Sequence, residues 1–185
     1  MHRYFPFLIH RYFPILMHSY FPVTPIPYVE TKSTKYLSDI ISKYSNSFPE
    51  LVSDEDEGII SKLDISYCSI GCGNLKTNEI LESKRNRFIY FNSEKIITKT
   101  NDLKEYTQIH KYDIGVILKI FNSNFPKRVQ IFVAGIGEYG TSGAAWFLSH
   151  KWMTIEKKVG TKEFCVILKV KNGFDESSEI LDILY

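Results

Sequence analysis

The sequence predicts a three-layer α/β domain with a mixed, mostly parallel sheet. Residues 114–121, 129–134 and 164–170 are apolar almost throughout, which is typical of strands buried on both faces of a sheet. Segments with helical periodicity alternate with such strands, and this alternation favours helices on both sides of a largely parallel sheet. The link from residue 121 to residue 129 is too short for a helical crossover, so these two strands should be antiparallel neighbours.

The composition is that of one globular domain. The chain has 185 residues, of which 44% are hydrophobic and 24% are charged. Its net charge of +2 comes from scattered basic residues rather than a cluster, so we expect no nucleic-acid partner. The cysteines Cys68, Cys72 and Cys165 lack the paired spacing of a zinc site, which predicts free thiols, a reducing cytoplasm and no metal.

Residues 1–23 form an unusual arm. The unit His-(Arg/Ser)-Tyr-Phe-Pro recurs at His2, His10 and His18, and its prolines exclude a continuous helix. The histidines could bind a metal and the aromatic residues could lie at a membrane interface, but a poorly ordered low-complexity arm is the favoured interpretation. The apolar run is too interrupted to span a membrane, so we do not expect membrane association. Residues 24–185 are then expected to form a single α/β domain.

Helices and strands alternate in the first half of this domain. Residues 24–30 are predicted as a short strand, 33–45 as a helix with apolar residues at helical spacing, and 57–63 as one more short helix. A strand at 64–70 and a helix at 75–84 follow. Residues 87–92 and 94–100 are predicted as a hairpin that turns at Asn92-Ser93.

The second half contains the most apolar segments. Residues 113–121 and 129–134 are predicted as strands, followed by a helix from Thr141 to about Met153. Residues 163–170 are predicted as the last strand, and 175–184 as a closing helix or a short turn.

A glycine loop follows the strand at 129–134. Gly135, Gly137 and Gly140 have the spacing G-x-G-x-x-G between a strand and a helix, where the backbone can approach a ligand and the helix start attracts an anion. Thr141 and Ser142 lie where hydroxyls could cap the helix or contact a phosphate. A tight turn between strand and helix explains the same glycines equally well, so both interpretations stay open.

A second glycine loop follows the strand at 64–70. Gly71 and Gly73 are followed by Asn74, Thr77 and Asn78, which could bind hydroxyls or a base. Because ligands of open α/β sheets bind beyond the carboxyl ends of strands, we expect the two loops to lie side by side and to share one pocket. The acidic residue that would bind a ribose is missing at its usual distance from the glycines, since the nearest candidates, Asp175 and Glu176, come after the predicted last strand.

These loops give the chain a resemblance to Rossmann-like nucleotide-sensing and nucleoside-processing domains. The resemblance covers about residues 64–170 and implies that the glycines contact a ribose or phosphate and that Glu138 is the acting carboxylate. Glu138 as a solvent-exposed loop residue is the alternative, and Tyr139 either stacks on a ring or packs on the sheet edge. The hypothesis is that the chain binds or senses a small ligand carrying phosphate or ribose. The alternatives are a nucleoside- or nucleotide-processing enzyme that uses Glu138, and a non-catalytic structural or interaction module. The sequence identifies neither a cofactor nor an oligomeric state.

Overall fold

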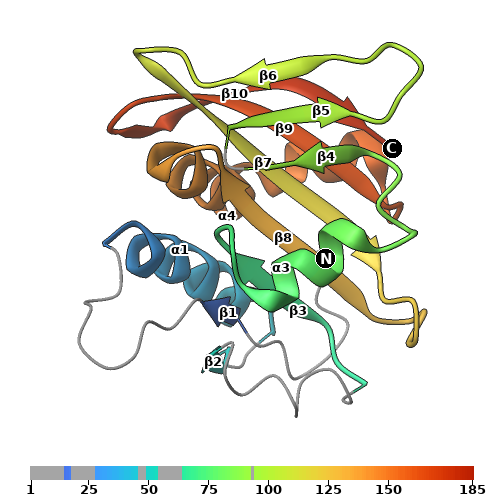
Figure 1. The fold of residues 1–185 in the computed structure, drawn as a ribbon. Coiled ribbons are helices and arrows are strands. Elements are labelled where there is room, and N and C mark those ends of the chain that lie inside the picture. The colour runs from blue at the N-terminus through green and yellow to red at the C-terminus, as the bar shows by residue number, and fades with distance from the viewer. Residues whose placement is uncertain (1–14, 18–27, 46–48, 54–63, 93) are drawn as a thin grey trace.

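The computed structural model describes residues 15–17, 28–45, 49–53, 64–92 and 94–185 (Figure 1). The predicted short helix at 57–63 and most of the arm at 1–23 lie outside these ranges. Within the arm, Ile15–Met17 form strand β1 of the main sheet, between β2 and β3. The division of the chain at residue 24 stays a prediction.

The large sheet has seven strands in the order β10-β9-β7-β8-β3-β1-β2 (Figure 1). Neighbours from β10 to β8 are antiparallel, and neighbours from β8 to β2 are parallel. Its strands are β1 (Ile15–Met17), β2 (Leu51–Ser53), β3 (Tyr67–Ile70), β7 (Tyr112–Phe121), β8 (Val129–Gly135), β9 (Phe164–Lys171) and β10 (Phe174–Leu184).

The predicted three-layer Rossmann-like architecture with a mostly parallel sheet is wrong. Half of the pairings in the large sheet are antiparallel, because β7 lies between β8 and β9, β9 lies between β7 and β10, and all three pairings are antiparallel. The second face of the sheet is covered by a small antiparallel sheet together with one helix. The small sheet contains β4 (Ile89–Phe91), β5 (Lys95–Thr98) and β6 (Glu105–Thr107), and the helix is α3 (Leu75–Glu82).

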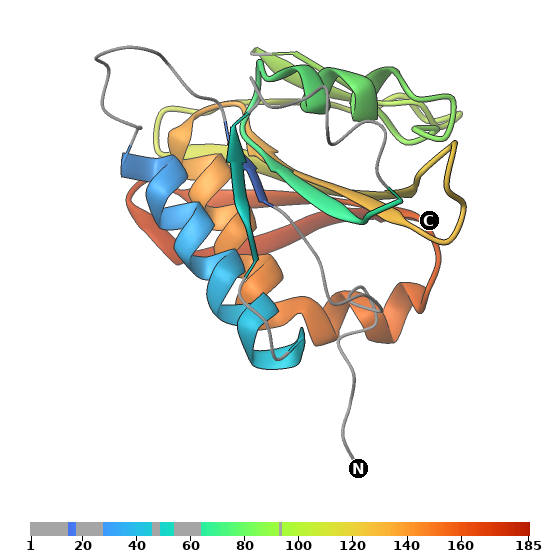
Figure 2. The same ribbon diagram turned by 90° about the horizontal axis from the view of Figure 1, so that it is seen from below.

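The other face of the large sheet is covered by two helices, α1 (Tyr28–Ser45) and α4 (Glu138–Val159), as Figure 2 shows. Leu37 and Ile41 of α1 are buried at helical spacing, and the rings of Tyr44 and Trp152 meet edge to face at 5.5 Å between the two helices. Helix α4 ends at Gly160, whose φ of 60° is the left-handed conformation that favours glycine.

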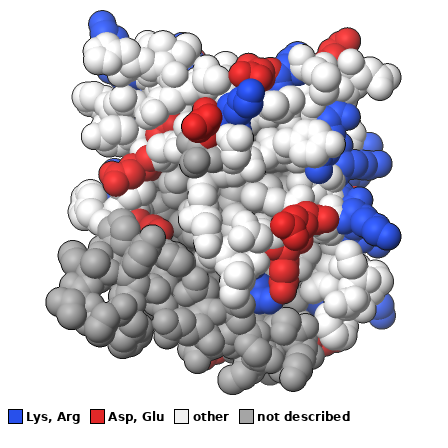
Figure 3. Space-filling model, viewed as in Figure 1, with Lys and Arg blue, Asp and Glu red and all other residues white. Residues whose placement is uncertain are grey.

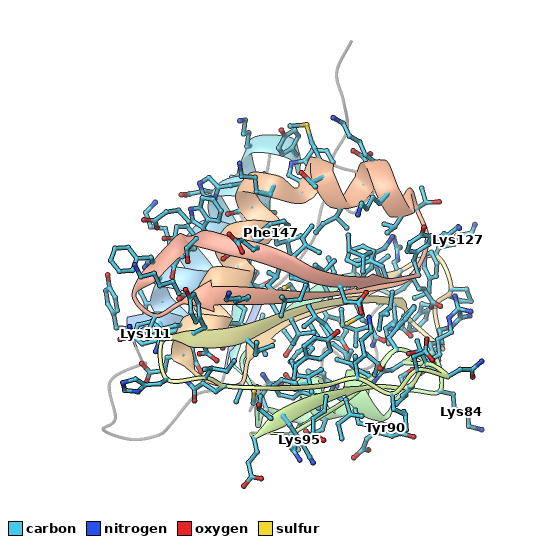
Figure 4. All side chains as sticks on the ribbon, turned by 90° about the horizontal axis from the view of Figure 1, so that it is seen from above. Lys84, Tyr90, Lys95, Lys111, Lys127 and Phe147 are labelled. Carbon is cyan, nitrogen blue, oxygen red and sulfur yellow. The ribbon has the colours of Figure 1, made fainter. Side chains whose placement is uncertain are left out.

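The period-2 alternation of strand side chains gives the protein two hydrophobic cores, one on each face of the large sheet. We call them the helix-side core and the small-sheet core. In β8, Ile131 and Val133 face the helix-side core, while Phe132 and Ala134 face the small-sheet core. The apolar runs therefore predicted burial on both faces correctly, but not that a second sheet would cover one of them. Figure 4 shows Phe147 of α4 on one side of the large sheet and Tyr90 of the small sheet on the other.

Three further predictions about elements need correction, and two are confirmed. Residues 175–184 are not a helix or turn but most of the edge strand β10, whose backbone hydrogen bonds are supplied by β9. Residues 28–30 begin helix α1 rather than ending a strand, and α4 extends beyond the predicted range at both ends. The antiparallel pair β7–β8 and the hairpin β4–β5 are confirmed.

Candidate functional site

The backbone N–H groups at the start of α4 bind a carboxylate of the protein itself. Asp113 of β7 is fully buried, and its carboxylate accepts hydrogen bonds from the backbone N–H groups of Gly137 at 3.0 Å and Gly140 at 2.7 Å. It also accepts from the N–H of Ile114 at 2.7 Å. The start of a helix attracts an anion because its first N–H groups are unpaired and the dipole is positive there. Here that anion is Asp113.

The glycines of this loop are explained by the same packing. A Cβ at Gly137 would lie 2.6 Å from Oδ2 of Asp113, and one at Gly140 would overlap the carbonyl oxygen of Ile114. A Cβ at Gly135 would overlap the backbone of Gly140. Side chains at these positions would therefore separate α4 from β7 and β8 or displace the Asp113 carboxylate.

The second loop is stabilised by its own side chains. Gly71 and Gly73 have φ values of 79° and 98°, which are strained for other residues. Asn74 caps α3 by accepting from the N–H of Thr77 at 2.7 Å, and its amide donates to the carbonyl of Ile70 at 3.2 Å. The Thr77 hydroxyl donates to the carbonyl of Gly71 at 2.9 Å. Asn74 and Thr77 are buried, so these two predicted ligand-binding side chains are instead used to shape the loop.

The two loops, 71–74 and 135–141, lie side by side, as predicted; we call them the loop pair. Strands β3 and β8 are parallel neighbours, and the N–H of Gly71 donates to the carbonyl of Val133 at 2.9 Å. The thiol of Cys72 lies 3.5 Å from the carbonyl oxygen of Gly135. Cys72 is exposed as a residue, but desolvation of its sulfur, which faces the Gly135 carbonyl, together with the carboxylates of Asp113 and Glu30, raises the pKa of Cys72 to about 12. Cys72 is therefore a protonated donor rather than a nucleophile at neutral pH.

A second buried carboxylate joins α1, α4 and β10. Asp175 accepts from the hydroxyl of Ser142 at 2.7 Å and from the hydroxyl of Tyr36 at 3.1 Å, and it pairs with the ammonium of Lys32 at 2.6 Å. Burial opposes the charge on Lys32, but the hydrogen bond with Asp175 raises its pKa. Burial and the negative charge of Asp175 raise the pKa of Tyr36. The predicted phosphate-binding hydroxyl of Ser142 is thus a donor to an internal carboxylate.

Some of the remaining predicted site residues are exposed to solvent, and others are buried with their polar groups hydrogen-bonded inside the protein. The Thr141 hydroxyl donates to the carbonyl of Gly137 at 3.2 Å and is buried. Tyr139 is 41% exposed in the first turn of α4. The other residues that stay exposed in or next to the loop pair are Cys72, Gly73, Leu75, Asn78 and Glu138.

Sequence reasoning missed Asp113, and a signal for it was present. It is a charged residue next to the start of a mostly apolar strand. Lys119 in the same strand and Gln130 in β8 show the same signal, and both are buried as well. A polar side chain inside a doubly buried strand has to find a partner, so it marks an internal network or a site.

Neither the surface charge nor a metal site marks out a further functional region among the described residues. On the face seen in Figure 3, acidic and basic side chains are interspersed, and the basic ones gather along the right-hand margin. Among the described residues, no group of three or more His, Cys, Asp or Glu side chains could hold a metal ion. No helix in the described ranges is long and apolar enough to cross a membrane.

The fold and the loop pair define the protein as a mixed α/β domain in which the N–H groups of a glycine loop bind a carboxylate of the protein itself. No known protein family matches the chain, and no curated protein is similar to it in sequence. The function is therefore argued from the site alone.

Proposed function

We propose that the loop pair binds a small ligand through sugar-like hydroxyl groups, as a nucleoside would offer, rather than through a phosphate. The carrying observation is that the Asp113 carboxylate already accepts the hydrogen bonds of Gly137 and Gly140, which a phosphate would need. A phosphate next to this buried carboxylate would be repelled, because like charges in a site of low dielectric are strongly unfavourable.

Negative charge around the loop pair supports a ligand that donates hydrogen bonds. The carboxylates of Asp113 and Glu30 act on the thiol of Cys72. Glu138 is exposed in the first turn of α4. Glu138 lies within the glycine loop and not at the position of the ribose-binding acid of dinucleotide folds, but its exposed carboxylate can accept hydrogen bonds from ligand hydroxyls.

Exposed backbone next to these carboxylates gives a ligand room to approach. At Gly73, a Cβ would meet no atom within 4 Å, so this part of the loop is open. Gly137 is partly exposed, and the amide of Gln108 lies near it, 2.9 Å from where a Cβ would be. A sugar ring on this surface would lie near the carboxylate acceptors and near the amide of Gln108.

Thermal unfolding with nucleosides, nucleoside 5′-monophosphates and inorganic phosphate tests this proposal. A nucleoside at about 100 times its Kd should raise the stability by about 2.7 kcal/mol and the Tm by roughly 5–10 °C. The matching monophosphate should raise it no further, and inorganic phosphate alone should have no effect. Glu138→Gln should weaken binding, while Glu94→Gln, an exposed glutamate in the β4–β5 turn, should not.

Two results would contradict the proposal. Stabilisation by inorganic phosphate would mean that the loop pair accepts an anion despite Asp113. No stabilisation by any nucleoside would favour the interaction module. Turnover of a stabilising nucleoside that Glu138→Gln abolishes would extend the proposal to a nucleoside-processing enzyme.

A further inference from the structure

A polar cleft of about 270 Å³ lies at the end of the large sheet where β3 and β8 begin, opposite the loop pair. Its floor is formed by Tyr67 of β3 and Gln130 of β8. One wall comes from α3 and the residues after it, with Glu79 and Lys84, and the other from the β7–β8 loop, with Asn122 and Asn124. Figure 4 shows Lys84 at the same end of the molecule as Lys127 of the β7–β8 loop.

The floor of the cleft is a pair of buried polar side chains. Tyr67 and Gln130 are register partners in neighbouring strands, and they are only 3% and 8% exposed. The Gln130 amide donates to the Tyr67 hydroxyl at 2.6 Å. Within the described residues, this is the hydrogen bond that the Gln130 side chain makes, so its carbonyl oxygen and second amide hydrogen can serve a ligand.

Gln130 is the one polar residue of β8, and it lines the cleft. Every other residue of β8 is apolar or glycine, and a buried amide is unfavourable unless its hydrogen bonds are made. An apolar side chain would fill the same position without that cost. A ligand in the cleft would satisfy the amide.

The walls offer further donors and acceptors held in place. The carbonyl oxygen of Asn122 accepts from the N–H groups of Asn124 at 2.9 Å and Phe125 at 3.2 Å, which fixes its side chain and leaves its amide hydrogens as donors. Glu79 and Lys84 bring one negative and one positive charge to the opposite wall. Glu79 is further neutralised by Lys76 at 2.7 Å.

These features define the class of ligand. Donors and acceptors converge from two strands, one helix and one loop, and the charged groups at one wall carry both signs, so hydrogen bonds rather than a single charge characterise the cleft. Its volume is below the roughly 300–1,000 Å³ of pockets that hold drug-sized ligands. We propose that this cleft binds a small neutral polyol of monosaccharide size, at a site separate from the loop pair.

Residue-resolved NMR of the ¹⁵N-labelled full chain tests this proposal, with D-glucose, D-galactose and D-ribose as the probes. At least one sugar should cause saturable shifts of the side-chain amides of Asn122, Asn124 and Gln130. Gln130→Met, of similar volume, should weaken this binding about tenfold, the loss expected for one hydrogen bond. Asn124→Ala should also weaken it, and because Asn124 is exposed, this variant keeps the fold if Gln130→Met does not.

The matched control is Asn101→Ala, which removes an exposed amide between β5 and β6 and should leave sugar binding unchanged. The proposal is overturned if no sugar causes saturable shifts of the cleft amides, or if Gln130→Met and Asn124→Ala bind as tightly as the wild type. Shifts confined to Gly73 and Gly137 would place the sugar at the loop pair and would overturn the cleft site alone.

Discussion

At the scale of residues, the most consequential group is the buried carboxylate of Asp113. It stabilises the start of α4 by accepting two of its N–H groups, and it makes the glycine loop a site for an internal anion. Without Asp113, the N–H groups of Gly137 and Gly140 would be left for an anion from outside the protein. Under the proposed function, this single residue in β7 is what excludes a phosphate from the loop pair.

Asp113→Asn should lower the free energy of unfolding by about 2–4 kcal/mol. An amide group would turn one N–H₂ toward backbone donors that are buried, and each unsatisfied buried donor costs about 1–3 kcal/mol. Urea unfolding measures the difference. Asp102→Asn, at an exposed carboxylate, is the control and should change stability by less than about 0.5 kcal/mol. Equal stability of both variants would show that the Asp113 contacts are energetically unimportant.

Gly137→Val should be destabilising even though the φ of Gly137, −122°, is accessible to any residue. The added side chain would meet the Asp113 carboxylate at 2.6 Å, so either the carboxylate or the loop must move. Gly73→Val is the comparison, because at Gly73 the cost comes from the φ of 98° and no atom lies within 4 Å of the Cβ. Combining Gly137→Val with Asp113→Ala should recover part of the lost stability, and strictly additive losses would contradict this explanation.

Lys119 gives the stability a defined dependence on pH. Its side chain is buried and donates to the carbonyls of Thr161 at 2.8 Å and Lys162 at 3.1 Å. Burial, opposed by Glu163, lowers its pKa from 10.5 to about 8. The unfolded chain therefore binds more protons than the folded one between these two pKa values, so the contribution of Lys119 to the free energy of unfolding rises with pH from about 8 to 10.5.

Comparison of wild type and Lys119→Met by urea unfolding at pH 7, 9 and 10.5 isolates this contribution. The full pKa difference corresponds to about 3 kcal/mol, so the stability of the wild type relative to the variant should improve by up to that amount across the range. A pH-independent difference between the two proteins would mean that Lys119 titrates alike in the folded and unfolded chain.

At the scale of elements, local patterns predicted what each segment buries but not its partners. The apolar runs of β7, β8 and β9 identified buried strands, and the short link identified the antiparallel pair. Residues 175–184 carry many helix-forming side chains, yet pairing with β9 makes them a strand, because tertiary contacts override local propensity. The loop pair was predictable from glycines that follow strands. The hydrogen bonds between the N–H groups of this loop and Asp113 were not predictable, because Asp113 lies 24 residues from Gly137 in the sequence.

The short strand β1 is expected to contribute stability well beyond its three residues. Ile15 is fully buried in the helix-side core, and its N–H donates to the carbonyl of Glu50 at 2.8 Å. Ile15→Ala should therefore cost about 2–4 kcal/mol in urea unfolding. Leu51→Ala in the adjacent β2, where Leu51 is 52% exposed, should cost much less. Similar small losses for both variants would mean that β1 is not part of the folded core.

At the scale of the whole molecule, one sheet separates two cores. The helix-side core and the small-sheet core are built from alternate residues of the same strands, so neither can lose its packing without changing the strands that the other uses. We therefore expect the described part of the chain to unfold as one cooperative unit. The tryptophans Trp146 and Trp152 both lie on α4, on the helix side, and report on one core only.

This location of the tryptophans allows a direct test of cooperativity. Ile96 of β5 is fully buried in the small-sheet core, and Ile96→Ala should lower the free energy of unfolding by about 2–4 kcal/mol. Because the cores share the sheet, tryptophan fluorescence should shift to lower urea by the same amount as far-ultraviolet circular dichroism, although no tryptophan lies near Ile96. Ile97→Ala, one residue along and half-buried on the outer face, should shift both signals much less. An unchanged tryptophan transition in Ile96→Ala, with loss of structure detected only by circular dichroism, would show that the small sheet unfolds independently and that the two cores are not coupled.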